Sequence, residues 1–232
     1  MEGSELDWYS KTWYNEDKKP VYFITRKIIL KWLKKEKKEK LLDVGCGYGI
    51  LTKLIRNKCD AKITAIDYDS ESLEKAKRTL EGTDVKVEKQ NILDLPYADN
   101  TFDILISTGY TSAATLPGAI KEVKRVVKPN GLIILDYLRF YNLYYLFSGN
   151  FFNRLKRYRK KEDESQYYFG KLGLKKYFEQ ENGLKIEEIR SFYSYPPFLK
   201  SNKQKLLFEK TFGIIFRPFL ARVLILKIRN TK

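Results

Sequence analysis

The fold of this chain is decided by the stretch Lys40-Leu-Leu-Asp43-Val-Gly45-Cys-Gly47-Tyr-Gly49-Ile-Leu-Thr52. Its apolar residues before the first glycine predict a short buried strand, and the residues from 50 to 56 predict the start of a helix. The glycines let the backbone bend tightly and let a ligand come close. The first N–H groups of a helix have no internal partner, and the helix dipole favours negative charge there. The stretch therefore predicts a ligand site, and the simpler interpretation is a plain glycine turn.

Two classes of ligand use such a turn. Dinucleotide sites need Gly-x-Gly-x-x-Gly, and Ile50 occupies the third glycine position here, so that match fails. The spacing Gly-x-Gly-x-Gly, with an acid two residues ahead, resembles the first motif of class I S-adenosylmethionine-dependent methyltransferases. The resemblance implies that the turn amides meet the methionine part of S-adenosylmethionine and that Asp43 lies near its amino group. The cofactor-binding residues implied in this stretch are Asp43, Gly45, Cys46, Gly47 and Gly49.

A second predicted strand, over residues 62–66, ends on Asp67. In nucleotide-binding α/β folds an acid at this place accepts both ribose hydroxyls, because its two oxygens can meet two O–H donors. The family resemblance gives Asp67 the same role. The alternative is that Asp67 caps the next helix, but Ser70 already supplies a helix start and Asp69 could also cap it.

The third predicted strand, over 86–90, leads into a run that resembles the next signature of the family. In that signature an acid holds the adenine amino group, and Asn91 stands here in its place. An amide oxygen can still accept a hydrogen bond, so we expect weaker adenine recognition at the same position. Ile92 would lie against the adenine face. The other cofactor-binding residues that we expect are Tyr68 and Thr108, the latter after a fourth strand over 102–106.

The residues that follow this fourth strand do not reveal the acceptor chemistry. The chain lacks the Asn/Asp-Pro-Pro-aromatic sequence of enzymes that methylate base amino groups, and Tyr195-Pro196-Pro197 follows a much later strand. The chain has no histidine, which removes the commonest general base. The catalytic residue is therefore unknown. Asp136, Tyr110 and Tyr195 are candidates for a general base, although structural roles suit all three better.

The string from Glu122 to Gly131 is similar to the helix-to-strand passage of the same family, so the resemblance extends across 40–136. It implies one α/β domain over 1–232 with a Rossmann-like, mostly parallel seven-stranded sheet. The last strand of this sheet is expected to be antiparallel, and helices are expected on both of its faces. Further helices are expected over 21–38, 70–80, 116–127 and 171–181. Further strands are expected over 132–135, 184–194 and 221–228.

Three segments outside this frame combine aromatic or apolar residues with charge. Residues 1–20 carry four aromatic side chains and predict a lid arm over the cofactor or the substrate, or an arm docked on the surface. Residues 137–170 join an aromatic cluster to a basic run, which predicts a substrate cap inserted after strand five, or a satellite core. Residues 198–220 mix apolar and basic residues, and packing is a better interpretation than contact with an anionic membrane.

The chain is strongly basic, with 45 Lys and Arg against 29 Asp and Glu and a formal net charge of +16. This excess favours acidic partners such as nucleic acid or anionic lipid, or only a soluble, Lys/Glu-rich surface. Two cysteines and no histidine argue against a metal site. The acidic N-terminus is no signal peptide and no apolar run reaches membrane-spanning length, so we expect a cytoplasmic protein.

These observations predict methyl transfer from S-adenosylmethionine to a small-molecule or lipid-like acceptor. An RNA methyltransferase is the first alternative, because of the charge, and a non-catalytic methyltransferase-like binding protein is the second. The oligomeric state stays open.

Overall fold

The computed structural model describes residues 20–36, 39–108, 118–138, 171–192, 198–199, 201–213, 215, 221 and 223–232. The predicted lid arm over 1–20 and the predicted cap over 137–170 lie outside these residues, except at 20 and 137–138. The candidate bases Tyr110 and Tyr195 also lie outside them.

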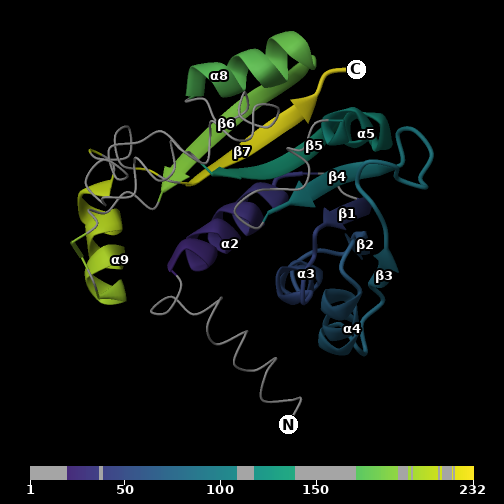
Figure 1. Ribbon diagram of the computed structural model, residues 1–232, viewed down its shortest axis with the longest axis horizontal. Coiled ribbons are helices and arrows are strands. Elements are labelled where there is room, and N and C mark those ends of the chain that lie inside the picture. Colours follow the sequence, from purple (N-terminus) through teal and green to yellow (C-terminus); the bar gives the residue numbers. More distant parts are fainter. Residues whose placement is uncertain are drawn as a thin grey trace, which may run out of the picture.

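A seven-stranded sheet forms the centre of the described part of the chain, in the order β3-β2-β1-β4-β5-β7-β6 (Figure 1). Strands β1 to β5 are parallel, and β7 runs antiparallel to both of its neighbours, β5 and β6. This confirms the predicted mostly parallel sheet with an antiparallel last strand. The strands are β1 Lys40–Val44, β2 Lys62–Asp67, β3 Lys86–Lys89, β4 Phe102–Ser107, β5 Val127–Leu138, β6 Leu184–Phe192 and β7 Val223–Asn230.

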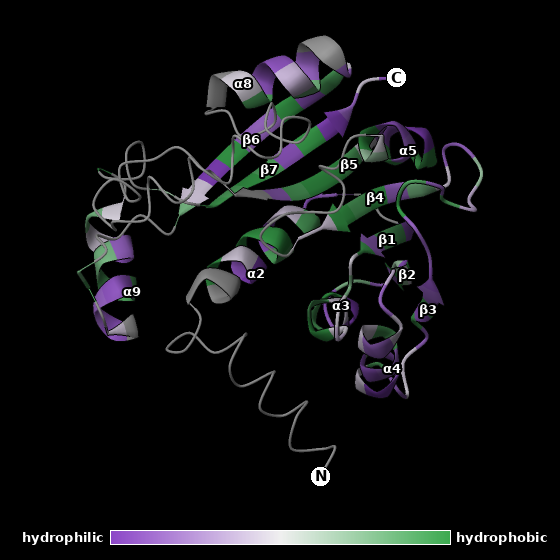
Figure 2. Cartoon of the chain, in the orientation of Figure 1, coloured by the Kyte–Doolittle hydropathy of each residue, from purple (hydrophilic) through white to green (hydrophobic). Residues whose placement is uncertain are grey.

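Helices cover both faces of this sheet, as expected. One hydrophobic cluster joins α2 and α3 to side chains such as Leu41, and the other joins α5, α8 and η3 to the opposite face, for example at Leu42. Successive residues of a strand point to opposite faces, so β1 serves both clusters. Figure 2 shows hydrophobic residues along β1 and β4 and hydrophilic ones on the edge strand β3. The helices are α2 Pro20–Leu33, α3 Ile50–Arg56, α4 Ser70–Thr79, α5 Ala119–Val126, α8 Lys171–Lys175, the π-helix η3 Lys176–Glu181 and α9 Asn202–Thr211.

The passage from α5 to β5 differs from the sequence prediction. The helix ends at Val126 and the strand begins at Val127, so residues 128–131 lie inside β5, where the register opposite β4 shifts. A Cβ on Gly131 would lie 2.5 Å from Val127 Cγ1, so close packing requires this glycine. The Asn230 amide donates to the carbonyls of Lys124 (3.1 Å) and Val127 (2.8 Å) and so satisfies the helix end.

A network of four charges ties the segment after α2 to the two last strands of the sheet. Arg229 lies 3.0 Å from Glu36 and 2.8 Å from Glu187, and Lys227 contacts the same two carboxylates at 2.9 and 3.0 Å. Hydrogen bonding from Arg229, before the other causes, lowers the pKa of Glu187 to about 2. The network holds residue 36, just beyond α2, against β6 and β7, and so supports the packing of that helix on the sheet.

The carboxyl ends of the parallel strands lie at one end of the sheet. Asp43 pairs with Ala65 and with Ile106, near the ends of their strands. At this end Leu138 pairs with Val223, and Val223 pairs with Phe192. The connection from β6 to β7, which contains α9, therefore lies at the carboxyl end too, and open α/β sheets bind ligands there. In the described part of the chain, no helix has the length and apolar character needed to span a bilayer.

Candidate functional site

The glycine turn after β1 is fastened to the end of β2. The N–H groups of Gly45 and Cys46 both donate to the carbonyl of Ile66, at 2.8 and 3.0 Å, and the Gly49 N–H donates to Cys46 at 2.9 Å. Gly45 and Gly49 both have φ of 71°, in the left-handed region that favours glycine. The predicted strand, turn and helix are thus confirmed, with Gly49 at the N-terminus of α3.

The glycines of this turn meet different surroundings. A Cβ on Gly49 would lie 3.0 Å from Leu80 Cδ1 and 3.4 Å from Ala76 Cα, so this glycine permits close packing of the turn on α4. A Cβ on Gly45 or Gly47 would meet no atom of the described residues within 4 Å. The backbone at these two positions therefore borders open space, which a ligand can fill without displacing protein atoms.

Asp43 is a buried carboxylate under the turn, with 3% of its surface exposed. The Thr52 hydroxyl, from α3, donates to it at 2.6 Å. Burial, the largest cause, and the charge of Asp67 raise the pKa of this carboxyl from 3.8 to about 6, against the opposing effect of Thr52. A buried carboxylate of this kind is stabilised by a cationic partner.

Asp67, the last residue of β2, connects the turn to the start of α4. Its carboxylate accepts the N–H of Gly47 at 2.8 Å and the N–H of Asp69 at 3.0 Å. The cap of α4 is Asp69, whose side chain accepts the Ser72 N–H at 2.8 Å. The alternative that Asp67 caps the helix is therefore wrong. Each carboxylate oxygen of Asp67 can still accept a further hydrogen bond.

Two hollows lined by described residues lie beside the turn, and Gly45 lines both of them. The larger has a volume of about 340 Å³, and the smaller, of about 40 Å³, lies on the side of Asp43. Of the predicted cofactor-binding residues, only Gly47 and Gly49 line neither. The larger hollow is lined by Val44, Gly45, Ile66, Asp67, Tyr68, Gln90, Asn91 and Ile92, and the smaller by Thr25, Arg26, Ile29, Asp43, Gly45, Cys46, Leu51 and Thr108.

The walls of the larger hollow differ in character. Ile92 is 6% exposed and offers an apolar wall. The Asn91 side-chain oxygen accepts the Leu93 N–H at 3.0 Å, which leaves its second lone pair and its amino group for a ligand. Tyr68 is 72% exposed at the rim, with the Lys89 ammonium 5.8 Å from its ring centroid. The hollow thus combines polar groups with an apolar wall, which suits a nucleoside.

Sequence reasoning missed the contribution of α2 to the smaller hollow. Thr25 and Arg26 line it together with Cys46, whose thiol pKa is raised first by burial and then by Asp43 and Asp67. The available signal was Thr25, a polar residue one helical turn before Ile29 on the stripe that faces the core; it is only 8% exposed.

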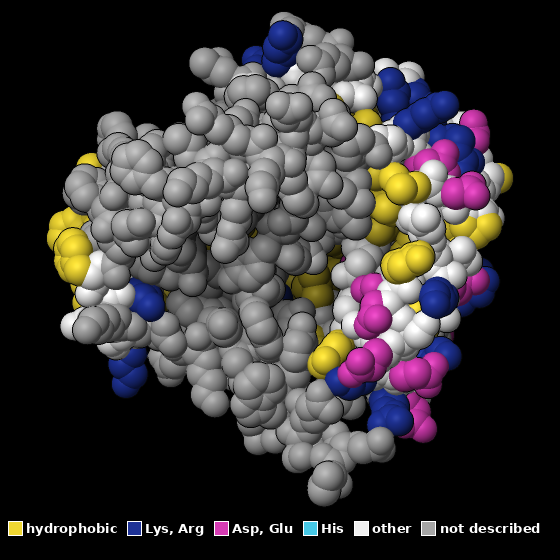
Figure 3. All heavy atoms as spheres, in the orientation of Figure 1, with side chains coloured by type: hydrophobic (Ala, Val, Ile, Leu, Met, Phe, Trp, Pro, Cys, Tyr) yellow, Lys and Arg dark blue, Asp and Glu magenta, His cyan; other side chains and the backbone are white. Residues whose placement is uncertain are grey.

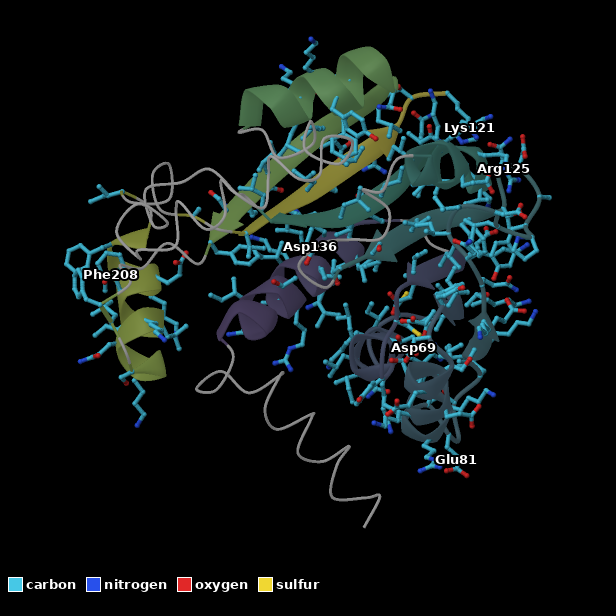
Figure 4. All side chains as sticks on the ribbon, viewed as in Figure 1. Asp69, Glu81, Lys121, Arg125, Asp136 and Phe208 are labelled. Atoms are coloured by element: carbon cyan, nitrogen blue, oxygen red, sulfur yellow. The ribbon has the colours of Figure 1, made fainter. Side chains whose placement is uncertain are left out.

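The geometry gives little support to a general-base role for Asp136, the one candidate among the described residues. Asp136 is 5% exposed near the carboxyl end of β5. Figure 4 shows it beside α2, and it lines neither hollow. Its role stays a prediction.

Comparison with known proteins places this geometry in a family. Residues 42–135 match the model of a family described as a methyltransferase domain. Over 187 residues the chain is 30% identical to demethylmenaquinone methyltransferase of Staphylococcus aureus, covering 73% of this chain and 77% of that protein. The matched residues include the glycine turn and extend into β5.

Solved structures share the fold. A candidate sarcosine dimethylglycine methyltransferase from Galdieria sulphuraria is 17% identical, with a TM-score of 0.62 over 98% of both chains. A geranyl diphosphate methyltransferase, in complex with GPP and sinefungin, is 13% identical, with a TM-score of 0.59 over 92% of this chain and 80% of that one. The match to the domain model and the 30% identity carry the family assignment, and the open space at the turn fits its cofactor. The chain belongs to the class I S-adenosylmethionine-dependent methyltransferases, and S-adenosylmethionine is its methyl donor.

Proposed function

We propose that this enzyme methylates a small, lipid-like acceptor at the carboxyl end of the sheet and that the two hollows beside the glycine turn hold the donor. The observation that carries this proposal is the pair of hollows that meet at Gly45, with Asp67 in one and Asp43 in the other. S-adenosylmethionine has a ribose with two hydroxyls and an ammonium group, and each suits one of these carboxylates.

Different residues of the larger hollow bind different parts of the nucleoside. Asp67 is already oriented by two backbone N–H groups and accepts the ribose hydroxyls with its remaining lone pairs. Ile92 packs against the adenine face. Asn91 accepts from the adenine amino group more weakly than an acid would, because a neutral amide is a weaker acceptor than a carboxylate.

The residues of the smaller hollow suit the methionine part. Asp43 meets the ammonium group, which favours the ionised form of this buried carboxyl. Arg26 is the cation among the lining residues, and its guanidinium suits the carboxylate of the amino acid. Thr108, after β4, completes the lining near the position where the acceptor must approach.

When bound, S-adenosylmethionine supplies a methyl group that its sulfonium already activates. The protein has to hold donor and acceptor in line and to exclude water, and orientation alone contributes about 7–11 kcal/mol. A base is needed only if the acceptor must lose a proton as it gains the methyl group. We propose that the arm over 1–20 and the cap over 137–170 cover the acceptor, because both are rich in aromatic residues.

The acceptor class is proposed from the relatives and from the sequence together. One relative is named for demethylmenaquinone and one structural neighbour for geranyl diphosphate, both small molecules with apolar parts. The chain also lacks the base-methylation motif. An RNA acceptor rests on the net charge alone, and the relatives do not support it.

Calorimetry with S-adenosylhomocysteine tests the donor site. We expect micromolar binding to the wild type and at least a tenfold loss in Asp67→Asn, because an amide offers one acceptor oxygen where the carboxylate offers two. Asp60→Asn, at an exposed position, is the matched control and should bind as the wild type does. Absence of binding to the wild type, or equal binding by both variants, would refute the proposed donor site.

A second experiment tests the acceptor. The wild type is incubated with methyl-labelled donor and, separately, with a demethylated prenyl hydroquinone in detergent, kept reduced by an added chemical reductant, with a short phosphorylated prenyl chain and with RNA. We expect label in a prenyl compound and none in RNA. Label in RNA alone would contradict the acceptor class. Donor binding without transfer to any of the three would favour the non-catalytic alternative.

A further inference from the structure

The outer side of α9 is apolar, which is unusual for a helix at the surface. Leu207 is 62% exposed, Phe212 53% and Ile215 65%. Helical hydrogen bonding continues past the end of α9, from Phe212 N–H to Phe208 O at 2.8 Å and from Ile215 N–H to Phe212 O at 3.0 Å. The apolar side chains of this segment therefore share one side of the helix. We name this set, Leu207, Phe208, Phe212 and Ile215, the α9 stripe. Phe198, just before α9, is 75% exposed.

The inner side of α9 is defined by other residues at helical spacing. Leu206, Glu209 and Gly213 are buried, at positions i, i+3 and i+7. The helix thus already buries a face, and the stripe is a second apolar face that points away from it. Figure 4 shows Phe208 on the outer side of α9, and its ring lies 5.5 Å from that of Phe212. Packing, which the sequence analysis preferred for 198–220, accounts only for the inner side.

Lysines flank the stripe on both sides. On a helical wheel Lys203 and Lys210 lie next to Leu207, and Lys205 lies next to Phe212. The only acid of α9 is Glu209, and it is turned inward with 4% exposure. Figure 3 shows hydrophobic side chains with Lys and Arg below them at the left of the molecule, where Figure 1 places α9. An apolar stripe between lysines is typical of helices that lie in the surface of an anionic membrane.

We propose that the α9 stripe docks this protein on the surface of an anionic lipid bilayer. The occupant is chosen by charge, since the lysines border the stripe on both sides and the whole chain carries +16. The docked helix lies at the carboxyl end of the sheet, on the same side as the glycine turn. Docking would therefore place the end of the sheet that carries the glycine turn on the side of α9 that meets the bilayer. The docking proposal depends only on the residues of the α9 segment. It does not depend on which acceptor the enzyme methylates.

Cosedimentation of the full chain with lipid vesicles tests this docking. The wild type should bind vesicles of phosphatidylcholine with one quarter phosphatidylglycerol and should bind pure phosphatidylcholine far less. The double variant Lys203→Gln/Lys210→Gln should lose about 30-fold in affinity, at about 1 kcal/mol per lysine. Leu207→Ser/Phe212→Ser should lose at least as much, because it removes the apolar contact.

Two controls separate docking from other effects. Lys58→Gln/Lys62→Gln removes the same charge beside the amino end of β2, at the opposite end of the sheet, and should keep wild-type vesicle binding. Calorimetry with S-adenosylhomocysteine should give wild-type affinity for every variant, so a folding defect or a failed donor site is recognised separately.

Several outcomes would overturn the docking proposal. One is a wild type that does not bind anionic vesicles. Another is a stripe variant that binds them with wild-type affinity. The third is a control variant, Lys58→Gln/Lys62→Gln, that loses as much vesicle affinity as the Lys203→Gln/Lys210→Gln variant. A wild-type dimer that the stripe variant abolishes, without vesicle binding, would assign the stripe to a second copy of this chain instead.

Discussion

Substitution of Gly49 by alanine should destabilise the protein more than substitution of Gly45. Both glycines have φ of 71°, so both variants carry the same left-handed strain. They differ in what the new methyl group meets. At Gly49 it lies 3.0 Å from Leu80 Cδ1, and at Gly45 it meets nothing within 4 Å. The pair therefore isolates a steric contact at constant backbone conformation.

The magnitudes follow from these distances. The left-handed conformation costs about 1–2 kcal/mol for alanine relative to glycine. Overpacking a filled site costs about 1–3 kcal/mol more, and the lower half of that range applies because Leu80 has to yield by only a few tenths of an ångström. Leu80 is 3% exposed and cannot turn into solvent. We therefore expect about 1–2 kcal/mol for Gly45→Ala and about 2–4 kcal/mol for Gly49→Ala.

Equilibrium urea unfolding, followed by circular dichroism without ligand, measures both free energies. In the background Leu80→Ala the extra cost of Gly49→Ala should vanish, because the added methyl group then faces a cavity. Equal destabilisation by the two variants, or an unchanged difference in the Leu80→Ala background, would refute the packing argument. Donor binding should show the reverse order, with Gly45→Ala weaker, because Gly45 lines both hollows.

Four further predictions concern charge. Burial raises the pKa of Asp43 to about 6, so the contribution of this group to the stability of the ligand-free protein should grow as the pH falls from 7 towards 4. In urea titrations the unfolding free energy of the wild type minus that of Asp43→Asn should therefore rise over this range. Donor affinity, which needs the ionised form, should fall about tenfold per pH unit below pH 6 in calorimetry. The pKa of Glu187 is lowered to about 2, so the stability that this carboxylate contributes is present above about pH 4.5 and is lost as the pH falls towards 2. Glu187→Gln should therefore be less stable than the wild type at pH 6 and equal to it near pH 2. Arg125→Gln, which loses bonds to Leu95 O (2.9 Å) and Tyr97 O (2.6 Å), should unfold about 1–3 kcal/mol more easily and bind the donor more weakly, since this turn follows Asn91.

Local patterns were enough to predict the parts of the site that lie on short, continuous segments. The glycine turn, the acid after β2 and the position of Asn91 each depend on a few adjacent residues. An error of one residue in the predicted position of a strand would have moved its side chains to the other face of the sheet. The structure places Asp67 in the larger hollow and Asp43 in the smaller one. The mostly parallel seven-stranded sheet with its antiparallel last strand followed from the family resemblance and was confirmed.

Features that depend on distant contacts could not be predicted in this way. Asn230 satisfies the end of α5 across more than a hundred residues of sequence, and no local pattern marks it. Glycine occurs both at helix ends and at tight approaches of backbone, so the sequence alone did not place Gly131 inside β5. The exposed face of α9 was also missed, since composition gives the amount of apolar surface and not the side on which it lies.

The net charge of +16 should act in opposite directions on the donor and on the membrane. The donor carries a net positive charge, so the protein as a whole repels it, while Asp43 and Asp67 attract it over a few ångströms. Salt screens charges that lie farther apart than about 8 Å at 0.15 M far more than it screens a buried pair. Raising the salt concentration should therefore leave donor affinity unchanged or slightly higher, and it should weaken vesicle binding through the α9 lysines. A donor affinity that fell steeply with salt would show that exposed charges hold the donor, which contradicts the assignment to Asp43 and Asp67.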